Sequence, residues 1–359
     1  MLKRVSIQNF KSLKDVTLDL QKVNLLIGPN NSGKTNFLKA LEFIKERYRD
    51  LTRRDDKELT FNRNGLPFQF SLTDDSKKPV RIDIPFDFIS DKTPTVTNGE
   101  ENFTGNGSFP DIPGWKELER LLKSAIVYKP DPNKIIHPGI VGNGEEIVKS
   151  DASNLVGFLD LMLGKYRRTV FVRIESDVNI CIPEFNEIKL GDVFDITEER
   201  KKLFGDKSFK RIGLANIERD ITYWADELSE GTLYFLTLLC IIHQPNPPKL
   251  LLLEEPEKGI HPRRIEEVIN FIFGLAEEKD IQVIMTTHSP IVVDMFKDMP
   301  ESVFVFDKDE EGATHVKNLQ KDIIEPETAE SERLGIDPPQ YLNGLGQAWK
   351  VGLIGGVPR

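Results

Sequence analysis

Residues 23–36, VNLLIGPNNSGKTN, decide the fold of this chain. An apolar run ends at Gly28, and the pair Lys34-Thr35 then opens a helical pattern of apolar residues. This order predicts a strand, a loop and a helix. Glycines at the two ends of the loop, Gly28 and Gly33, let main-chain N–H groups curl around an anion, and the helix start adds its positive dipole end. The pattern G-x-x-x-x-G-K followed by Thr is therefore typical of a loop that binds the β- and γ-phosphates of a nucleotide.

Residues within this phosphate loop have distinct predicted roles. Lys34 is expected to reach the phosphate oxygens and to act in catalysis, and the hydroxyl of Thr35 is expected to ligate Mg²⁺. The other residues expected to contact the nucleotide are Gly28, Asn30, Asn31, Ser32, Gly33 and Asn36.

The bulk composition limits the class of protein. With 359 residues, of which 39% are hydrophobic, the chain can bury a core in one large domain or two smaller ones. A net charge of −10 argues against a protein whose whole surface binds nucleic acid.

The cysteines and the apolar runs indicate the compartment. Cys181 and Cys240 lie far apart in apolar surroundings, so neither a disulfide framework nor a zinc site is expected. The sequence opens on an alternating strand pattern instead of a signal peptide, and no apolar run reaches the length of a membrane span. We therefore expect a soluble, cytoplasmic protein without a membrane partner.

Two groups of basic residues leave local contact with nucleic acid open. Residues 200–211, RKKLFGDKSFKR, carry six basic side chains around two phenylalanines, and Lys165, Arg167 and Arg168 form a second group. Basic residues interleaved with aromatic ones are typical of nucleic-acid surfaces. Charged runs are more often solvated faces, and the acids just before position 200 dilute the first group.

Strand patterns on both sides of the phosphate loop predict an α/β sheet. Residues 5–10 and 16–20 alternate like strands and lead directly to the strand at 23–27, which predicts an antiparallel meander. Further along, a βαβαβ alternation specifies an α/β fold with a mixed or parallel sheet flanked by helices. Its predicted elements are strands at 249–253, 282–286 and 302–306 and helices at 262–276 and after Pro290.

The middle of the chain is predicted to be an α+β insertion. Heptads are absent between residues 45 and 220, and the prolines in this part exclude a long coiled coil. Its predicted elements are helices over 115–124 and after 151–154, with strand patterns over 68–72, 80–89 and 169–196. A further helix is predicted over 225–242, in the core. The predicted core comprises residues 1–48 and 210–320, the insertion 49–209, and a C-terminal extension 321–359.

Acidic residues end the buried strand at 249–253. Glu254 and Glu255 would lie at the carboxyl edge of the sheet, where α/β proteins bind ligands. Glu254 is suited to hold Mg²⁺ through a water and Glu255 to polarise an attacking water, because phosphoryl transfer needs mainly positioning and charge neutralisation. A core strand with a solvated turn is the alternative, which the phosphate loop disfavours. His288 follows the next strand, so its imidazole is expected beside the γ-phosphate and the catalytic water.

These motifs together carry a family resemblance. GPNNSGKT, LSEGT, LLLLEEPEKGIHP and MTTHSP occur in the order of the Walker A, signature, Walker B with D-loop, and H-loop motifs of ABC-type ATPases. The chain most resembles the branch with RecF, the SMC proteins and the OLD-like (overcoming lysogenization defect) ATPases. IQNFKSLKD resembles the N-terminal strand of that branch, which implies that Lys11 and Ser12 contact the nucleotide. The motifs cover residues 1–45 and 210–306.

The resemblance implies ATP-dependent assembly. Ser229 and Gly231 of the signature would act in trans on ATP held by another copy, giving a homodimer or a higher homo-oligomer. Two departures weaken the match. Glu254 stands where the family has aspartate, and Gln69 is the only glutamine in the interval expected for a Q-loop.

Comparison within the branch separates three hypotheses. Without coiled-coil arms the chain is unlike SMC proteins, and Asp307 and Asp309, which resemble the acid pair of a TOPRIM nuclease, are better explained by a hairpin with a charged turn. The first hypothesis is a stand-alone Mg²⁺-dependent ATPase whose ATP-driven dimer controls a separate effector, a nuclease or toxin, in bacterial anti-phage defence. The alternatives are a DNA-repair ATPase like RecF and an ATP-binding scaffold with negligible turnover. Residues 334–359 fit a docking segment for a partner and a tail packed on its own domain equally well.

Overall fold

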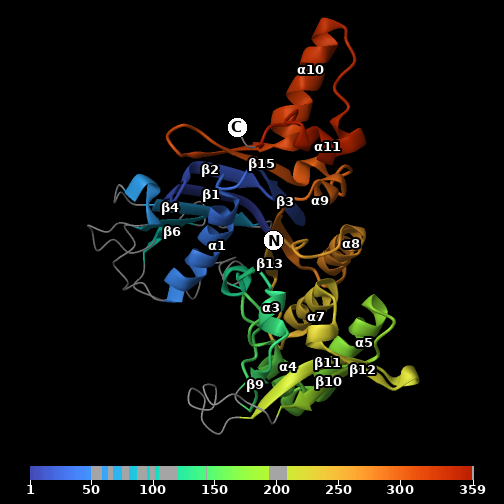
Figure 1. Cartoon of the computed structure of the whole chain (residues 1–359). Coiled ribbons are helices and arrows are strands. Elements are labelled where there is room, and N and C mark those ends of the chain that lie inside the picture. Colours follow the sequence, from blue (N-terminus) through green and yellow to red (C-terminus); the bar gives the residue numbers. More distant parts are fainter. Residues whose placement is uncertain are drawn as a thin grey trace. The chain divides into compact units, whose positions relative to one another are not determined.

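The computed structural model describes residues 1–49, 59–63, 68–74, 81–86, 95–97, 102–104, 120–142, 144–193 and 208–357 (Figure 1). The chain forms two compact units. The first consists of Met1–Val127, Lys249–Lys258 and Ile265–Arg359, and the second of Tyr128–Pro248 and Gly259–Arg264. This division differs from the predicted one, because residues 210–248 cluster with the second unit and the strands up to residue 104 with the first.

An antiparallel sheet opens the first unit, with strand order β2-β1-β4-β5-β6-β7. Its strands are β1 (Leu2–Phe10), β2 (Leu13–Asp19), β4 (Phe68–Asp74), β5 (Arg81–Phe86), β6 (Thr95–Thr97) and β7 (Asn102–Thr104). The hairpin β1–β2 confirms the first predicted pair of strands. Strands β4 to β7, which were expected in an insertion, extend this sheet instead.

The second sheet of this unit is mixed, with strand order β16-β15-β3-β14-β13-β8. Its strands are β3 (Val23–Ile27), β8 (Val127–Tyr128), β13 (Leu250–Glu254), β14 (Gln282–Thr286), β15 (Val303–Lys308) and β16 (Thr314–Asn318). Strands β13, β14, β3 and β15 run parallel, as the alternating pattern predicted. Strand β3 does not continue the hairpin, because all of its residues are buried and such a strand needs cover on both faces.

Helix α1 (Lys34–Arg49) packs between these two sheets (Figure 1). Its buried residues Phe37, Leu41 and Ile44 share one apolar cluster with Ile7 of β1 and Leu26 of β3. Burial of each such side chain contributes about 1.5–3 kcal/mol. The start of α1 is thereby fixed at the carboxyl end of β3.

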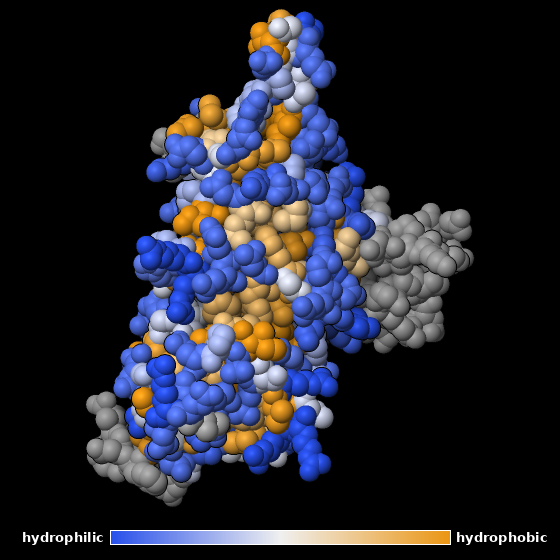
Figure 2. Space-filling view, turned by 90° about the vertical axis from the view of Figure 1, so that its right-hand side faces the viewer, coloured by the Kyte–Doolittle hydropathy of each residue, from blue (hydrophilic) through white to orange (hydrophobic). Residues whose placement is uncertain are grey.

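The remaining helical elements of the first unit lie C-terminal to β13. They are α8 (Pro262–Glu278, in this unit from Ile265), α9 (Pro290–Asp294), α10 (Glu325–Leu334), α11 (Leu345–Lys350), 3₁₀ turns at Pro300–Ser302 and Tyr341–Gly344, and a π-helical turn at Leu319–Ile324. A further 3₁₀ turn at Phe61–Arg63 precedes β4. Apolar side chains show at the tip where α10 ends (Figure 2), and Leu334 and Ile336 are each 59% exposed there.

The second unit combines helices with a small antiparallel sheet in which β11 pairs with β9, β10 and β12. Its elements are α3 (Pro132–Ile135), β9 (Gly139–Ile140), α4 (Leu155–Lys165), a π-helical turn (Arg167–Phe171), α5 (Val172–Cys181), β10 (Glu187–Asp192), β11 (Phe209–Asn216), β12 (Ile221–Trp224) and α7 (Glu230–His243), with 3₁₀ turns at Ile217–Arg219 and Ala225–Glu227. In the ranges that the structure describes, no helix has both the length and the hydropathy to cross a membrane.

The strand predicted over 169–196 is wrong in its first half, which is helical. Phe171, Ile174 and Val178 are buried at helical spacing, so packing overrides the β-branched composition of this stretch. The second half forms β10 as predicted. The apolar helix expected from residue 225 begins at Glu230, because Ser229 caps it. The helix predicted over 115–124 falls partly outside the described residues, and residues 120–123 are helical.

Candidate functional site

The phosphate loop runs from Gly28 to Gly33 between β3 and α1, as predicted. Both glycines have left-handed φ values, 144° at Gly28 and 108° at Gly33. A Cβ on Gly28 would lie 2.3 Å from the carbonyl oxygen of Phe306, and one on Gly33 would lie 2.2 Å from Thr314 Oγ1. The loop is therefore pressed against β15 and β16, and only glycine fits at its two ends. Asn30 and Asn31 are exposed at its tip.

Lys34 reaches back across this loop. Its Nζ donates hydrogen bonds of 2.8 Å to the carbonyl oxygens of Gly28 and Pro29. Burial lowers the pKa of Lys34 to about 8, although the carboxylates of Glu255 and Glu254 act in the opposite direction. The ammonium group thus stands among the loop carbonyls and next to both acids, which is where a cation can pair with a polyphosphate.

A hydrogen-bond network supports the loop from outside. Thr314 Oγ1 donates to the carbonyl oxygen of Ser32 at 2.9 Å and lies 2.7 Å from Ser12 Oγ. Asn36 Nδ2 donates to the same Ser12 hydroxyl at 2.9 Å. Ser12, expected to contact the nucleotide, therefore contacts the loop and the first turn of α1, and Thr314 is a supporting residue that the sequence did not indicate.

Glu254 lies at the end of β13, next to the first turn of α1. Its Oε1 accepts a 3.3 Å hydrogen bond from Thr35 Oγ1, so the extra methylene relative to aspartate still lets the carboxylate reach the loop. A hydroxyl and a carboxylate are the hard oxygen ligands that Mg²⁺ takes beside phosphates and water, so this pair fits the ion. In the described part of the chain no three His, Cys, Asp or Glu side chains form a metal cluster.

Glu255 and His288 meet at the same edge of the sheet, as predicted. His288 Nε2 lies 3.7 Å from Glu255 Oε1, and both side chains are partly exposed. Glu255 has a φ of 50°, and its N–H donates to the carbonyl and hydroxyl oxygens of Thr286. Backbone strain of this kind clusters at functional sites because it fixes the direction of a side chain.

Glu257 is a further acid of this turn, and no role was predicted for it. Glu257 is only 9% exposed. Its Oε1 accepts hydrogen bonds from Thr287 Oγ1 at 2.6 Å and from the N–H of His288 at 3.1 Å. A second glutamate after the acid pair was the one available signal. The turn after β13 is thus bonded directly to the turn that carries His288.

The signature residues lie in the second unit, at the start of α7. Ser229 is the N-cap of this helix, and its Oγ accepts a 3.1 Å hydrogen bond from the N–H of Thr232. Gly231 is buried in the first turn. The side chain of Glu230 occupies the space over Gly259, whose φ is 77°. A capped helix start of this length has the dipole and N–H groups that attract an anion.

Other predicted contacts have local roles. Lys11 lies in the turn between β1 and β2 with a φ of 49°, and burial together with nearby Lys39 lowers the pKa of its side chain. Gln69 lies in β4, opposite Gln8 of β1.

The basic groups are largely engaged where they are described. Lys210 Nζ lies 2.7 Å from Asp160, Arg211 stacks on the ring of Trp224 at 3.8 Å from its centroid, and Lys165 Nζ lies 2.7 Å from Glu146. Residues 200–207 lie outside the described ranges. Arg167 and Arg168 of the second group are exposed, so local contact with nucleic acid stays a prediction.

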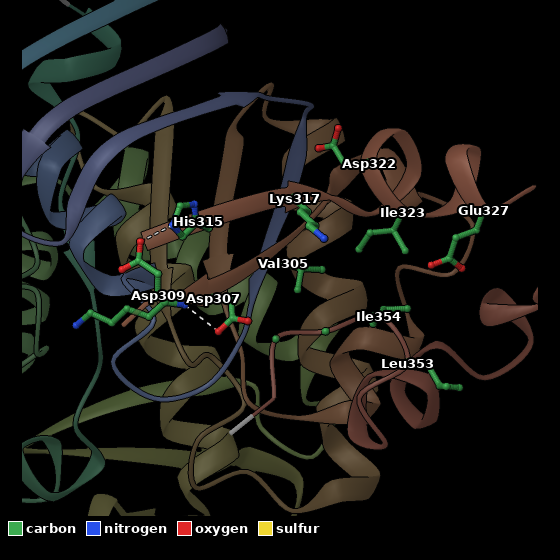
Figure 3. A pocket seen from close by; sticks show the side chains of 13 residues that line it. Val305, Asp307, Asp309, His315, Lys317, Asp322, Ile323, Glu327, Leu353 and Ile354 are labelled. Carbon is green, nitrogen blue, oxygen red and sulfur yellow. Dashed lines mark hydrogen bonds and ion pairs between the residues drawn. The ribbon is translucent and has the colours of Figure 1, made fainter. Parts of the chain in front are cut away.

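Asp307 and Asp309 belong to the hairpin β15–β16, as predicted. Asp309 points to His315, with its Oδ2 2.7 Å from Nε2, and lies in a pocket of about 340 Å³ together with Asp322 and Glu327 (Figure 3). The side chain of Asp309 also accepts from the N–H of Ala313, so it closes the hairpin turn.

The C-terminal segment packs on its own unit. Helix α11 lies on α9, where the N–H of Gly346 donates to Asp294 Oδ1 at 2.7 Å. Trp349 is buried, and its Nε1 donates to the carbonyl oxygen of Gly356 at 2.9 Å. A Cβ on Gly356 would lie 3.4 Å from Gly28 Cα. The segment thus forms one wall of a pocket of about 620 Å³ that includes Gly28 and His288.

Comparisons with known proteins indicate the family of this chain. A model of the AAA ATPase domain matches residues 1–204, and one described as AAA domain, putative AbiEii toxin, Type IV TA system, matches residues 153–294. The OLD nuclease of Thermus scotoductus is 23% identical over 82% of this chain and 60% of its own length. A putative ABC transporter ATP-binding protein of Pyrococcus horikoshii is 26% identical over 50% of this chain and 61% of its own length. The chain therefore spans less than two thirds of these relatives.

Solved structures show the same fold. The SMC head domain of Thermotoga maritima has a TM-score of 0.50 at 12% identity, with 88% of this chain and 98% of that chain covered. The Smc head domain of Pyrococcus furiosus, with an extended coiled coil and bound to the C-terminal domain of ScpA, has a TM-score of 0.53 at 13% identity, covering 92% and 99%. Since the first family model covers more than half of the chain, the protein belongs to the AAA ATPase domain family, among the ABC-type P-loop ATPases of the RecF, SMC and OLD-like group.

Proposed function

We propose that this protein is a Mg²⁺-dependent ATPase that converts ATP and water to ADP and phosphate. The observation that carries the proposal is the position of Glu255 and His288, 3.7 Å apart, at the sheet edge where Lys34 also lies. Lys34 would neutralise charge on the γ-phosphate, Glu255 would orient the attacking water and take its proton, and His288 would bind a phosphate oxygen. Thr35 and Glu254 would hold the Mg²⁺, which when bound offsets the charge of the β- and γ-phosphates.

The replacement Glu255→Gln tests this proposal. Gln keeps the shape of the side chain but cannot accept the proton, so phosphate release should fall by about 100-fold or more while ATP binding is retained. Glu278→Gln, an exposed acid at the end of α8, is the matched control and should behave like the parent. Equal turnover in Glu255→Gln and the parent would contradict the proposal and leave an ATP-binding scaffold.

The signature in the second unit supports the second part of the proposal, an ATP-driven dimer. Ser229 and Gly231 at the start of α7 would close over ATP held by the phosphate loop of another copy. Lys34→Ala and Ser229→Arg should each be inactive alone. Mixed in equal amounts they should recover about a quarter of the parent activity, because half of the pairs are mixed and each of these has one intact site. No recovery after exchange of subunits would contradict action in trans.

The third part of the proposal is that the ATP-bound pair controls a separate effector protein, a nuclease or a toxin, in anti-phage defence. Its support is the description of one matching model, which names a putative toxin of a toxin–antitoxin system, and the name of the OLD nuclease. Tagged Glu255→Gln protein should copurify with one specific protein at a molar ratio that is the same in repeated preparations. That ratio should differ between preparations made with ATP and with ADP. Binding of duplex DNA alone, weakening with salt, would favour the RecF-like alternative.

A further inference from the structure

A buried carboxylate lies between the two catalytic turns of the first unit. Glu257 Oε2 is inaccessible to solvent and has no hydrogen-bond partner among the residues that the structure describes. Burial raises the pKa of this side chain against the effect of the hydrogen bonds to Oε1. Burying a carboxyl group with one oxygen unpaired costs free energy. Folding alone would favour a neutral side chain here, so the position calls for an explanation in terms of what the carboxylate holds.

Glu257 holds the segment Thr287–Ser289. Its Oε1 accepts from the hydroxyl of Thr287 and from the N–H of His288, and Thr287 Oγ1 in turn accepts from the N–H of Ser289 at 3.0 Å. The N–H of Thr287 donates to the carbonyl oxygen of Leu26 at 3.3 Å. Each N–H of this segment therefore has an acceptor, and two of the three depend on Glu257 directly or through Thr287.

The register of the sheet explains why this link exists. Strands β13 and β14 are parallel neighbours, with Glu254 opposite Thr286, so the turns that follow them run side by side. Glu255 leaves the first turn and His288 leaves the second. A side chain that joins the two turns fixes the separation of these two groups, and a carboxylate does so more firmly than a neutral acceptor because charge-assisted hydrogen bonds are stronger.

We propose that Glu257 is a positioning residue of the ATPase site: its carboxylate holds the main chain of His288 so that the imidazole stays beside Glu255. Glu257 acts through the amide of His288 and through Thr287, without touching the nucleotide. This inference rests on the role proposed above for His288 in hydrolysis. It assigns a task to the one acid of the EEPE turn that the ATPase mechanism does not use.

Two substitutions of Glu257 separate positioning from charge. Glu257→Gln retains the Oε1 acceptor and should keep turnover within about fivefold of the parent, whereas Glu257→Ala removes the acceptor and should lower kcat by about 10- to 100-fold. KM and the Kd for ATP should stay within about threefold in both, because the phosphate loop is unchanged. Equal kcat in Glu257→Ala and the parent, or an equal loss in both variants, would overturn the inference.

A double-mutant cycle with His288→Ala tests whether Glu257 acts through the histidine. If it does, the double variant should turn over no more slowly than His288→Ala alone. Multiplicative losses would show an independent, merely structural effect and overturn the inference. Thr287→Val, which removes one donor to Oε1 but keeps the shape and the His288 amide bond, is the milder variant should Glu257→Ala fold poorly. It should show a smaller loss of kcat, about three- to tenfold, again without loss of affinity.

Hydrogen exchange gives a readout that does not need turnover. In folded Glu257→Ala, peptides spanning residues 285–290 should exchange faster than in the parent, while peptides of α1 should not change. Unchanged exchange in 285–290 would overturn the inference even if hydrolysis is slower in this variant. A parent that binds but never hydrolyses ATP would refute the proposed function, and the exchange measurement would still decide whether Glu257 holds the segment.

Discussion

The phosphate loop and the His288 turn lie at the same sheet edge but are held in different ways. The loop is fixed by its glycine contacts with β15 and β16, by Lys34 bound to two loop carbonyls, and by Thr314 bound to Ser32. In the His288 turn, two of the three N–H groups depend on a single buried carboxylate, Glu257, directly or through Thr287. Support shared among several groups tolerates the loss of one hydrogen bond, whereas support that depends mainly on one acceptor does not. The groups that bind phosphate should therefore be robust to side-chain changes, and the group that senses it should be sensitive.

The largest effect is expected where the loop depends on main-chain shape. In Gly33→Ala the new Cβ would lie 2.2 Å from Thr314 Oγ1 and 2.9 Å from Ser12 Oγ, at a φ of 108°. The loop must shift, so ATP affinity should fall by about 100-fold, the equivalent of about 3 kcal/mol of strain. Titration with a fluorescent ATP analogue measures this loss. Gly274→Ala in α8, where a Cβ meets nothing within 4 Å, is the control. Affinity within threefold of the parent in Gly33→Ala would show that the loop is not held by shape.

The second prediction uses the pKa of Lys34, which is lowered to about 8. As pH rises through this value Lys34 loses its charge, so ATP affinity should fall by up to about tenfold per pH unit. The free energy of unfolding should change in the opposite direction. Between the folded pKa near 8 and the ordinary value of 10.5 the unfolded chain binds more protons, so this lysine contributes increasing stability with pH.

Titrations and urea unfolding between about pH 7 and about pH 10 measure both trends. Lys34→Met, which has no charge to lose, should flatten both. An affinity that is independent of pH in the parent would mean that the main-chain N–H groups of the loop, and not the charge of Lys34, dominate binding.

The third prediction removes one hydrogen bond from the distributed support. Thr314→Val loses the hydroxyl that binds the carbonyl oxygen of Ser32 and the hydroxyl of Ser12. ATP affinity should fall only about three- to tenfold, since a hydrogen bond of this kind contributes about 1 kcal/mol. Thr17→Val in β2, which loses an exposed hydroxyl bond to Ser6 of β1, is the control. A loss as large as that in Gly33→Ala would make Thr314 the principal support and end the contrast with Glu257.

The same contrast explains how much of the site the sequence could predict. The loop from Gly28 to Lys34, the acids after β13 and the histidine after β14 are local patterns, in which an apolar strand ends at a residue with special chemistry. The positions of these residues at the ends of their strands were predicted from the sequence. The supports were not, because they depend on tertiary neighbours: Thr314 is separated from Ser32 by 282 residues, and nothing around Thr314 marks it. Glu257 was visible as an acid, but only the parallel register of β13 and β14 shows what it binds.

The prediction of secondary structure was wrong where amino-acid composition and packing favour different elements. The stretch after Thr169 is rich in β-branched residues, yet its buried positions follow a helical period and it forms α5. Both its helical spacing and its strand composition are present in the sequence, and the packing of the second unit decides between them. Likewise, β3 resembles a third strand of the opening hairpin until burial on both faces places it in the other sheet.

The smallest effect is expected for the C-terminal segment, which contacts the loop only from outside. Trp349→Phe removes the donor to the carbonyl oxygen of Gly356, which should lower the free energy of unfolding by about 1 kcal/mol. The midpoint of thermal unfolding should therefore fall by a few degrees. ATP affinity should change by less than about twofold, because Gly28 is also held against Phe306. Tyr341→Phe, which loses a hydroxyl bond to Glu327 in the same extension, is the matched control. If Trp349→Phe weakens ATP binding as much as Thr314→Val does, the segment belongs to the support of the phosphate loop, and a partner that displaces it would control nucleotide binding directly.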